Sequence, residues 1–410
     1  MLNETYFTQE IIKSFYNRYA VLVLKDAVQI LIKNKLLAKE DEEILKRTTT
    51  GIKTVKDFLK KSYIIYLSNG ILFRKDIETI KIIKKQLMFE LAIKTLLSGI
   101  NKSINYINLD NNLFSLTLNQ PIDAKFDSIH KKNNDFIFYL NNKEVKKVKT
   151  NISCKITKDI DFLEKDKNPF NVENDHPDAP EFIPYELKTI PKQEWVRQFR
   201  TAYGIIKNNI PEICDEICPF LDAIVPHGYE KGKQLSSSYF ESPGILYLSY
   251  TNTDIKQAEA IIHEVHHTIF NIIGWKHPLF NNDMSLKYYS AYRPDARHIK
   301  GCFLGLHAFV AVQNFYRSLA ENNSDNQIKF IETFFTLFLK NKKVIDVLEK
   351  YADFTHEGKL LFWDIKIKYN SDLNAYENHS KKYSETYTTV LQNVESHLAT
   401  AKKENNLLLY

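Results

Sequence analysis

The sequence predicts an α+β fold that is predominantly α-helical, and three observations carry this prediction. Apolar residues recur at helical spacing over most of residues 5–100 and again from residue 192 onwards. Two short β-prone runs lie between these regions, at residues 114–118 and 136–140, and Asn141-Asn142 after the second run indicates a turn. A further strand is expected at residues 244–250, directly before an apolar helix.

Composition divides the chain into three parts. Residues 1–165 form a helical N-terminal region with a small β segment, and this region is a candidate for peptide docking although no motif marks it. Residues 166–191 are rich in Pro, Asp and Asn, which is typical of a linker or surface strap. Residues 192–410 carry the candidate catalytic residues and are predicted to form a metal-binding catalytic domain.

Bulk properties exclude several classes of protein. With 44% apolar residues in 410, the chain is globular and can bury a sizeable core. The net charge of +6 is mild and the lysines are scattered, so no nucleic-acid partner is expected. Four cysteines are too few for a disulfide scaffold. No signal peptide and no apolar stretch of about 20 residues is visible, so a cytoplasmic protein without a membrane partner is expected.

The principal motif is the run His263-Glu264-Val265-His266-His267, an HExxH pattern. It lies in a predicted helix that Asp254 caps and Gly274 ends, and this helix is apolar around much of its circumference. Residues four apart share a helix face, so His263 and His267 are predicted to bind a divalent transition metal. Glu264 lies next to that face, whereas His266 points elsewhere. The alternative is a chance motif with satisfied core or surface histidines.

The third ligand decides the chemistry. The short-spaced zinc peptidases place Gly and His where this chain has Phe270 and Ile273, so that class is excluded. The other large peptidase class uses a later Glu, but no Glu occurs between Glu264 and Glu321. His307 is the preferred candidate, because it lies in an almost wholly apolar second helix that starts at about residue 296. The alternative is a satisfied core histidine.

A site of three histidines with open positions suits two chemistries. Zinc uses such sites for hydrolysis, and iron(II) uses related sites, more often two His and one carboxylate, for oxygen chemistry. Motif spacing alone does not choose between the two ions.

Four segments together resemble a known family. They are residues 244–249, the HExxH motif, residues 288–301 (YYSAYRPDARHIKG) and residues 306–312 (LHAFVAV). In this order they are similar to the HExxH-type 2-oxoglutarate-dependent peptide β-hydroxylases that modify ribosomally made peptides. The resemblance covers about residues 235–320. Ala291 stands where Pro or Thr is common in the family, and Tyr292 where Trp is common.

The resemblance implies a dioxygenase that uses Fe(II), 2-oxoglutarate and O2 to hydroxylate the β-carbon of a residue in a ribosomally made precursor peptide. It implies iron at His263 and His267, with His307 as third ligand. Arginine binds carboxylates bidentately, so Arg293 and Arg297 are candidates to hold the distal carboxylate of 2-oxoglutarate. The alternative for both arginines is a surface ion pair with Asp295.

The remaining site predictions concern substrate and proton chemistry. The strand at 244–250 is expected to be an edge strand that pairs an extended peptide, with Tyr247, Ser249 and, further along, Tyr289 as substrate-binding candidates. Glu264 is expected to order a ligand histidine or a pocket water. Two alternatives remain open: a zinc metallopeptidase with Glu264 as general base and zinc as the cofactor, and a binding module with a structural metal or none.

Overall fold

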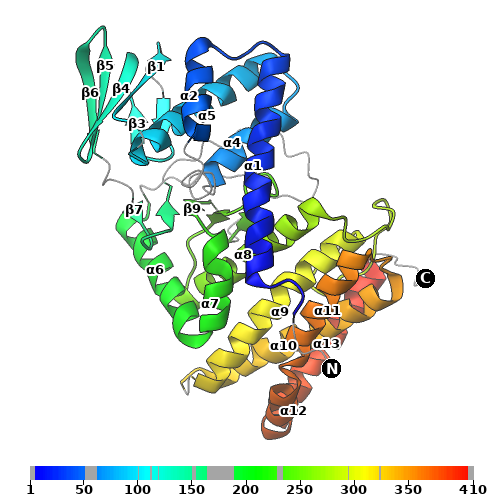
Figure 1. Ribbon diagram of the computed structural model, residues 1–410. Helices are drawn as coiled ribbons and strands as arrows, with labels where there is room; N and C mark the ends of the chain where they lie inside the picture. The colour runs from blue at the N-terminus through cyan, green and yellow to red at the C-terminus, as the bar shows by residue number, and fades with distance from the viewer. Residues whose placement is uncertain are drawn as a thin grey trace. The chain divides into compact units, whose positions relative to one another are not determined.

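The computed structural model describes residues 5–50, 62–99, 101–110, 113–118, 120–149, 154–163, 189–228, 234–293, 295–322 and 325–404. These residues form an α+β fold that is predominantly α, as predicted (Figure 1). The helices are α1 (Gln9–Lys33), α2 (Lys39–Thr50), α4 (Ser62–Phe73), α5 (Ile77–Leu97), α6 (Lys192–Asn209), α7 (Pro211–Ile217), α8 (Asp254–Lys276), α9 (Ile299–Asn322), α10 (Gln327–Tyr351), α11 (His356–Asn370), α12 (Leu373–Lys382) and α13 (Ser384–Glu404). The strands are β1 (Ser103–Asn108), β2 (Leu113–Ser115), β3 (Gln120–Ile122), β4 (Phe126–Lys132), β5 (Asp135–Leu140), β6 (Lys143–Lys149), β7 (Cys154–Lys155), β8 (Asp161–Phe162), β9 (Ala223–Pro226), β10 (Ser236–Ser238) and β11 (Ile245–Leu248).

The chain forms two compact units. Unit 1 contains residues 1–13, 201–220 and 251–410, and unit 2 contains residues 14–200 and 221–250. This division differs from the predicted boundaries, because residues 221–250 belong with the N-terminal unit and residues 1–13 with the C-terminal one. The predicted linker at 166–191 lies almost wholly outside the described residues. No helix in the described part of the chain combines the length and hydropathy needed to span a bilayer.

Unit 2 contains an antiparallel sheet of order β1-β4-β5-β6. The predicted run at 136–140 lies in β5, and Asn141 and Asn142 turn the chain into β6 with φ angles of 50° and 61°. Asparagine tolerates this left-handed conformation better than most residues, which explains the turn signal. Phe89 of α5 packs on this sheet, with ring centroids 6.1 Å from Phe126 and 6.5 Å from Phe138.

A second sheet in unit 2 has the order β10-β11-β9-β8-β7. Strand β11 is therefore an inner strand, and the prediction that residues 244–250 form an edge strand is wrong. It pairs antiparallel with β10 and parallel with β9. The serines of β10 form the outer strand, and Leu235 N donates to Ser249 Oγ at 3.0 Å beside this pairing. Since both edges of β11 are paired, no backbone groups remain there for an added peptide strand.

Unit 1 is built around α8 and α9, which pack against each other as predicted. The ring of Phe270 meets that of Phe303 edge-on, with centroids 5.2 Å apart. Two details of α8 differ from expectation. Thr253 rather than Asp254 caps its N-terminus, accepting from Lys256 N at 3.2 Å. Gly274 remains helical, and a Cβ there would come within 3.4 Å of Leu279, so its hydrogen allows close packing instead of a helix end.

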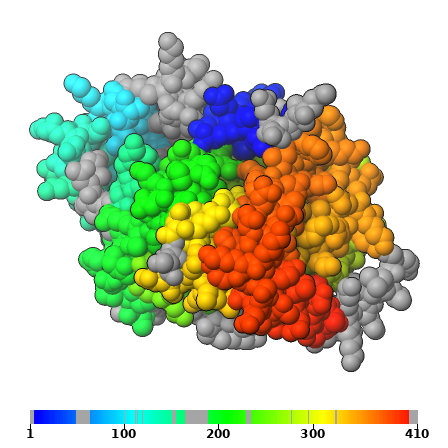
Figure 2. All heavy atoms as spheres, turned by 90° about the horizontal axis from the view of Figure 1, so that it is seen from below, coloured from blue at the N-terminus to red at the C-terminus, as the bar shows by residue number. Residues whose placement is uncertain are grey.

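The later helices of unit 1 share an aromatic core. Phe338 of α10 stacks on Tyr369 of α11 and Tyr376 of α12, with ring centroids 4.5 Å and 4.0 Å apart. Tyr383, which follows α12, donates its hydroxyl to Gln327 Oε1 at 2.8 Å. Figure 2 shows the outer side of this region, where the red residues near the C-terminus lie beside the yellow residues of α9. These contacts hold α10, α11 and α12 together.

Gly358, at the start of α11, is a position where any side chain is excluded. A Cβ built there would lie 1.8 Å from the carbonyl oxygen of Leu279. We expect Gly358→Ala to lower the free energy of unfolding by about 1–3 kcal/mol or more, because backbone must move. Gly204→Ala in α6 is the matched control, since nothing lies within 4 Å of its Cβ position. That control should stabilise the protein by about 0.5–1 kcal/mol. Urea unfolding of both variants measures the difference, and equal stability would contradict the contact.

Candidate metal centre

The two predicted ligands of α8 lie together. The rings of His263 and His267 have centroids 4.4 Å apart, as expected for residues four apart on one helix face. Both side chains are half-buried, and the ring of His263 also packs against Phe309 of α9, 4.6 Å between centroids. Glu264 is buried, with 3% of its surface exposed. The pair therefore forms as the motif predicts, and it faces the neighbouring helix.

His307 is placed on α9 within reach of a different histidine. Its ring centroid lies 5.4 Å from His266 and 5.8 Å from Phe270. Within the described parts of the chain, no three His, Cys, Asp or Glu side chains are arranged to hold a metal ion. A site formed by His263, His267 and His307 would therefore need a different rotamer of at least one of them. The sequence predicts the proximity of His263 and His267 correctly because the two residues share one helix face, whereas the position of His307 depends on how α9 packs.

The electrostatics of these histidines suit a metal. Nδ1 of His267 and Nδ1 of His307 are buried without a hydrogen-bond partner among the described residues. Burial lowers the pKa of both side chains well below the ordinary value, and the neighbouring His263 lowers the pKa of His267 further. Neutral imidazoles with an unpaired ring nitrogen are what a transition metal requires, and leaving them unpaired otherwise costs free energy. The residues present thus fit a divalent ion at the His263–His267 pair.

The same burial makes stability depend on pH in the metal-free chain. Burial lowers the pKa of His266 from 6.5 to about 4, and the charge of Glu216 only partly opposes this. The unfolded chain therefore binds more protons than the folded chain below about pH 6.5. Stability is complete above that pH and falls as the pH drops towards 4, by up to about 1.4 kcal/mol per pH unit for each such histidine. Urea unfolding between pH 7.5 and 5 measures this slope, and His266→Phe should reduce it. A flat profile would contradict the burial of these rings.

The two arginine candidates are both engaged with one carboxylate. Arg293 has 58% of its side chain exposed and places Nε 3.3 Å from Asp295. Arg297 has only 11% exposed and places Nε 2.7 Å from the other oxygen of Asp295. The alternative interpretation, an ion pair with Asp295, is therefore the one the structure contains. Neither arginine lines the cavity that holds His307.

The substrate-binding candidates separate into two groups. Tyr247 of β11 is fully buried, and Ser249 donates its hydroxyl to Gly228 O at 2.7 Å. The buried ring of Tyr247 and the hydrogen bond of Ser249 stabilise the β10-β11-β9-β8-β7 sheet of unit 2. The prediction that these two residues bind substrate is therefore not supported. Tyr289 differs, because its hydroxyl is buried without a hydrogen-bond partner in the described chain, and burial raises its pKa to about 12. It remains a protonated donor near neutral pH.

No protein-family model matches this chain, and no curated protein matches it significantly.

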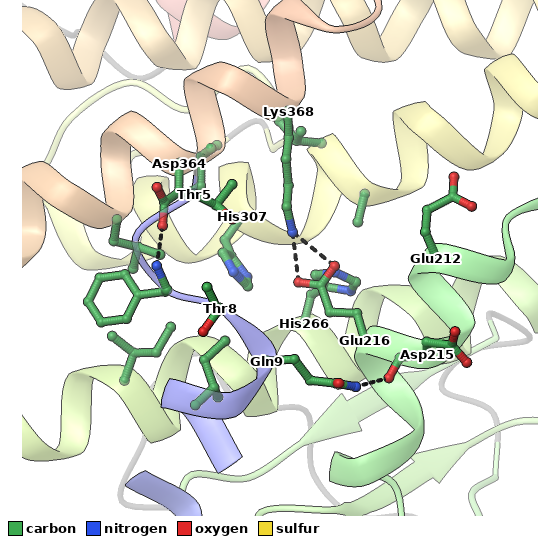
Figure 3. A pocket seen from close by; sticks show the side chains of 17 residues that line it. Thr5, Thr8, Gln9, Glu212, Asp215, Glu216, His266, His307, Asp364 and Lys368 are labelled. Carbon is green, nitrogen blue, oxygen red and sulfur yellow. Dashed lines mark hydrogen bonds and ion pairs between the residues drawn. The ribbon is translucent and has the colours of Figure 1, made fainter. Parts of the chain in front are cut away.

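A cavity of about 240 Å³ in unit 1 contains polar residues that the sequence did not indicate (Figure 3). His266 and His307 line it from α8 and α9, Glu216 from α7 and Lys368 from α11. Lys368 Nζ donates to both carboxylate oxygens of Glu216, at 2.7 Å and 2.9 Å. Burial alone would raise the pKa of Glu216, but the charge and hydrogen bonds of Lys368 lower it to about 2. The sequence signals for this cavity were His266 and His307, two histidines on apolar helices, whereas no motif indicated Glu216 or Lys368.

Proposed function

We propose that this chain is an Fe(II)- and 2-oxoglutarate-dependent dioxygenase that hydroxylates the β-carbon of a residue in a ribosomally made precursor peptide. The observation that carries the metal part of the proposal is the paired rings of His263 and His267, with Nδ1 of His267 buried and unpartnered. The choice of hydroxylation rests on the resemblance of residues 244–312. The lack of a Glu between Glu264 and Glu321, which a zinc peptidase would use as third ligand, also supports it.

The roles follow from the positions of the side chains. His263 and His267 would hold the ion, and His307 is the proposed third ligand from α9 after a change of rotamer. Iron(II) would supply the oxygen-activating chemistry, with 2-oxoglutarate and O2 as co-substrates. Glu264 lies beside His263 in the chain and is buried, so it is placed to orient a ligand histidine or a water.

The two remaining assignments concern the carboxylate clamp for 2-oxoglutarate and the surface that would bind the peptide. Arg297 is the better of the two carboxylate-clamp candidates, because its side chain is mostly buried whereas that of Arg293 is exposed. It would have to exchange Asp295 for the co-substrate carboxylate. The precursor peptide would not add to β11, whose neighbours β9 and β10 occupy both of its edges. Tyr289 stays a candidate to donate a hydrogen bond to substrate.

The decisive experiment follows co-substrate and peptide together. Protein reconstituted with iron(II) under anaerobic conditions is given 2-oxoglutarate, O2 and the precursor peptide. We expect succinate to form, and the peptide to gain the mass of one oxygen atom at one residue. His277→Ala should leave this activity intact, since His277 ends α8 and pairs with Glu357 at 3.5 Å.

The competing function gives the opposite result. A zinc metallopeptidase would cleave a peptide without 2-oxoglutarate, and Glu264→Gln would abolish cleavage while zinc stayed bound. Cleavage with that dependence, and no succinate with iron(II), would overturn the dioxygenase proposal. A chain that retains a metal but shows neither reaction would support the binding-module interpretation.

A further inference from the structure

The cavity of unit 1 shares His307 with the proposed metal centre, but its lining includes neither His263 nor His267. Four helices, α7, α8, α9 and α11, contribute its charged residues and histidines (Figure 3). The segment that leads into α1 contributes Thr5, Phe7 and Thr8. The side chains of His266 and His307 are buried at one end, whereas Glu216 and Lys368 are partly exposed. The cavity is thus accessible from the Glu216 side and closed at the histidines.

The charge of the lining favours a cation. Four carboxylates line the cavity, at Glu212, Asp215, Glu216 and Asp364, against the single ammonium of Lys368. Asp364 is already satisfied inside, because it accepts from the backbone N–H groups of Tyr6 and Phe7, both at 2.7 Å. Glu212 and Asp215 are exposed on α7. Carboxylates at the open side attract cations and repel anions, so an anionic ligand such as 2-oxoglutarate does not suit this cavity.

The closed end presents an unused hydrogen-bond acceptor. Nδ1 of His266 lies 2.7 Å from the carbonyl oxygen of Ile262, and a carbonyl oxygen can only accept, so Nδ1 carries the proton. Nε2 of the neutral ring is therefore an acceptor. This atom is buried and has no hydrogen-bond partner within the described residues. A buried acceptor without a donor costs free energy, which a ligand N–H would recover.

Glu216 already binds an ammonium group here. The Nζ atom of Lys368 contacts both oxygens of its carboxylate, and a carboxylate offers about four acceptor positions in all. Apart from Thr5, Thr8 and Gln9, the uncharged part of the lining is apolar, which suits an alkyl chain. These apolar lining residues are Phe7, Ile12, Ile273, Val310, Ala311, Leu361 and Ile365.

We propose that this cavity binds an alkylammonium group, with the ammonium between the carboxylate of Glu216 and Nε2 of His266 and the alkyl chain along the apolar wall. Two sources carry this chemistry, the lysine side chain of a peptide and a small free amine. Lys368 competes with the ligand for Glu216. The two residues assigned to the ammonium, Glu216 and His266, are not among the proposed metal ligands, so either proposal can fail alone.

Three probes of equal length test the charge preference. Butylamine, butanol and butyrate are titrated into the full chain by calorimetry at pH 7.5, with ligand-observed NMR for weak binding. Butylammonium should bind at least about tenfold more tightly than butanol, as a charged hydrogen bond to a partly buried carboxylate implies, and butyrate should not bind. Equal or tighter binding of butyrate, or no binding of butylammonium at millimolar concentration, would overturn the proposal.

Variants on two helices test the assigned contacts. Glu216→Gln removes the charge but keeps the shape, and should weaken butylammonium binding about tenfold. Glu212→Gln is its matched control on the same helix, and should change affinity less than about twofold because it is exposed. Lys368→Met removes the internal competitor and should strengthen binding. A purely structural ion pair would give weaker binding in Lys368→Met, or no change in Glu216→Gln, and either result would refute the assignment. Circular dichroism confirms folding.

Probes of different size distinguish the two possible ligands, a peptide lysine and a small free amine. Nα-acetyl-lysine methylamide presents the same ammonium on a peptide unit, and Nα-acetyl-norleucine methylamide lacks the charge. If the site takes a peptide lysine, the first compound binds at least as tightly as butylamine and the second does not bind. If it takes a small free amine, butylamine binds and both amides are excluded. Equal binding of the two amides would show that the ammonium is not recognised and would reject the proposal.

Discussion

His267→Ala is expected to abolish the proposed metal binding and, with it, the proposed hydroxylase activity. The residue is one half of the only local ligand pair that the motif supplies, and its ring lies 4.4 Å from that of His263. Loss of residues that merely support a metal ligand costs about 10–100-fold in affinity, so loss of a ligand should cost at least about 100-fold. Mass spectrometry of the purified protein measures the bound metal directly, and a thermal-melting shift on adding iron(II) or zinc measures it independently.

The control and the contrary result are well defined. His277→Ala has the same change of side chain at the end of the same helix and should retain the metal. His307→Ala tests the third ligand: weaker metal binding supports that assignment, whereas full retention would leave the pair with a different partner. Metal retained in both His263→Ala and His267→Ala would refute the metal centre and with it the dioxygenase proposal.

Asp372→Ala is expected to produce the largest loss of stability in unit 1. Asp372 is fully buried before α12 and accepts hydrogen bonds from three residues of α9. The donors are Gln313 Nε2 at 2.8 Å, Asn314 Nδ2 at 2.6 Å and Arg317 Nε at 2.6 Å. Removing the carboxylate leaves the Arg317 charge and two amides without this partner. Arg317 is 26% exposed and keeps Glu321 at 2.7 Å, so the expected cost is about 3 kcal/mol, the lower end of the range for breaking a buried ion pair.

Urea unfolding with a matched aspartate control measures this effect. Asp346 forms an exposed ion pair with Lys342 one turn away on α10, so Asp346→Ala should cost less than about 1 kcal/mol. If the free energy of unfolding of Asp372→Ala lies within about 1 kcal/mol of the wild-type value, solvent must replace the carboxylate as acceptor for the three donors. The network then does not stabilise the packing of α9 against the start of α12.

Local sequence patterns predicted the helices and the proximity of His263 and His267 well. The apolar periodicity around the HExxH motif predicted α8 almost to its ends, and residues four apart meet because a helix repeats every 3.6 residues. Asn141-Asn142 likewise predicted the turn between β5 and β6, because the conformation is set by the two residues themselves. The exact cap at Thr253 and the helical Gly274 were missed, since neighbouring residues compete for these positions.

Non-local pairing decided the features that the sequence did not predict. The sequence predicts β11 as an edge strand, whereas in the structure the serine strand β10 pairs with it. Three consecutive serines show no apolar periodicity, so the sequence does not indicate this pairing. The sequence predicts His307 as a third ligand, but it does not predict that the packing of α9 places the ring of His307 5.4 Å from that of His266. Glu216 and Lys368 are 152 residues apart and carry no motif, so only the packing of α7 near α11 reveals them.

The sequence by itself determined that a buried helix presents two histidines on one face, together with the predominantly helical class of the fold. These properties depend on side chains within a few residues of each other, whose relative positions the helix fixes. The tertiary structure decided the inner position of β11 in unit 2 and, in unit 1, the acidic cavity that His266 lines. Each depends on which distant segments pack together, because burial and charge pairing are set by neighbours in space.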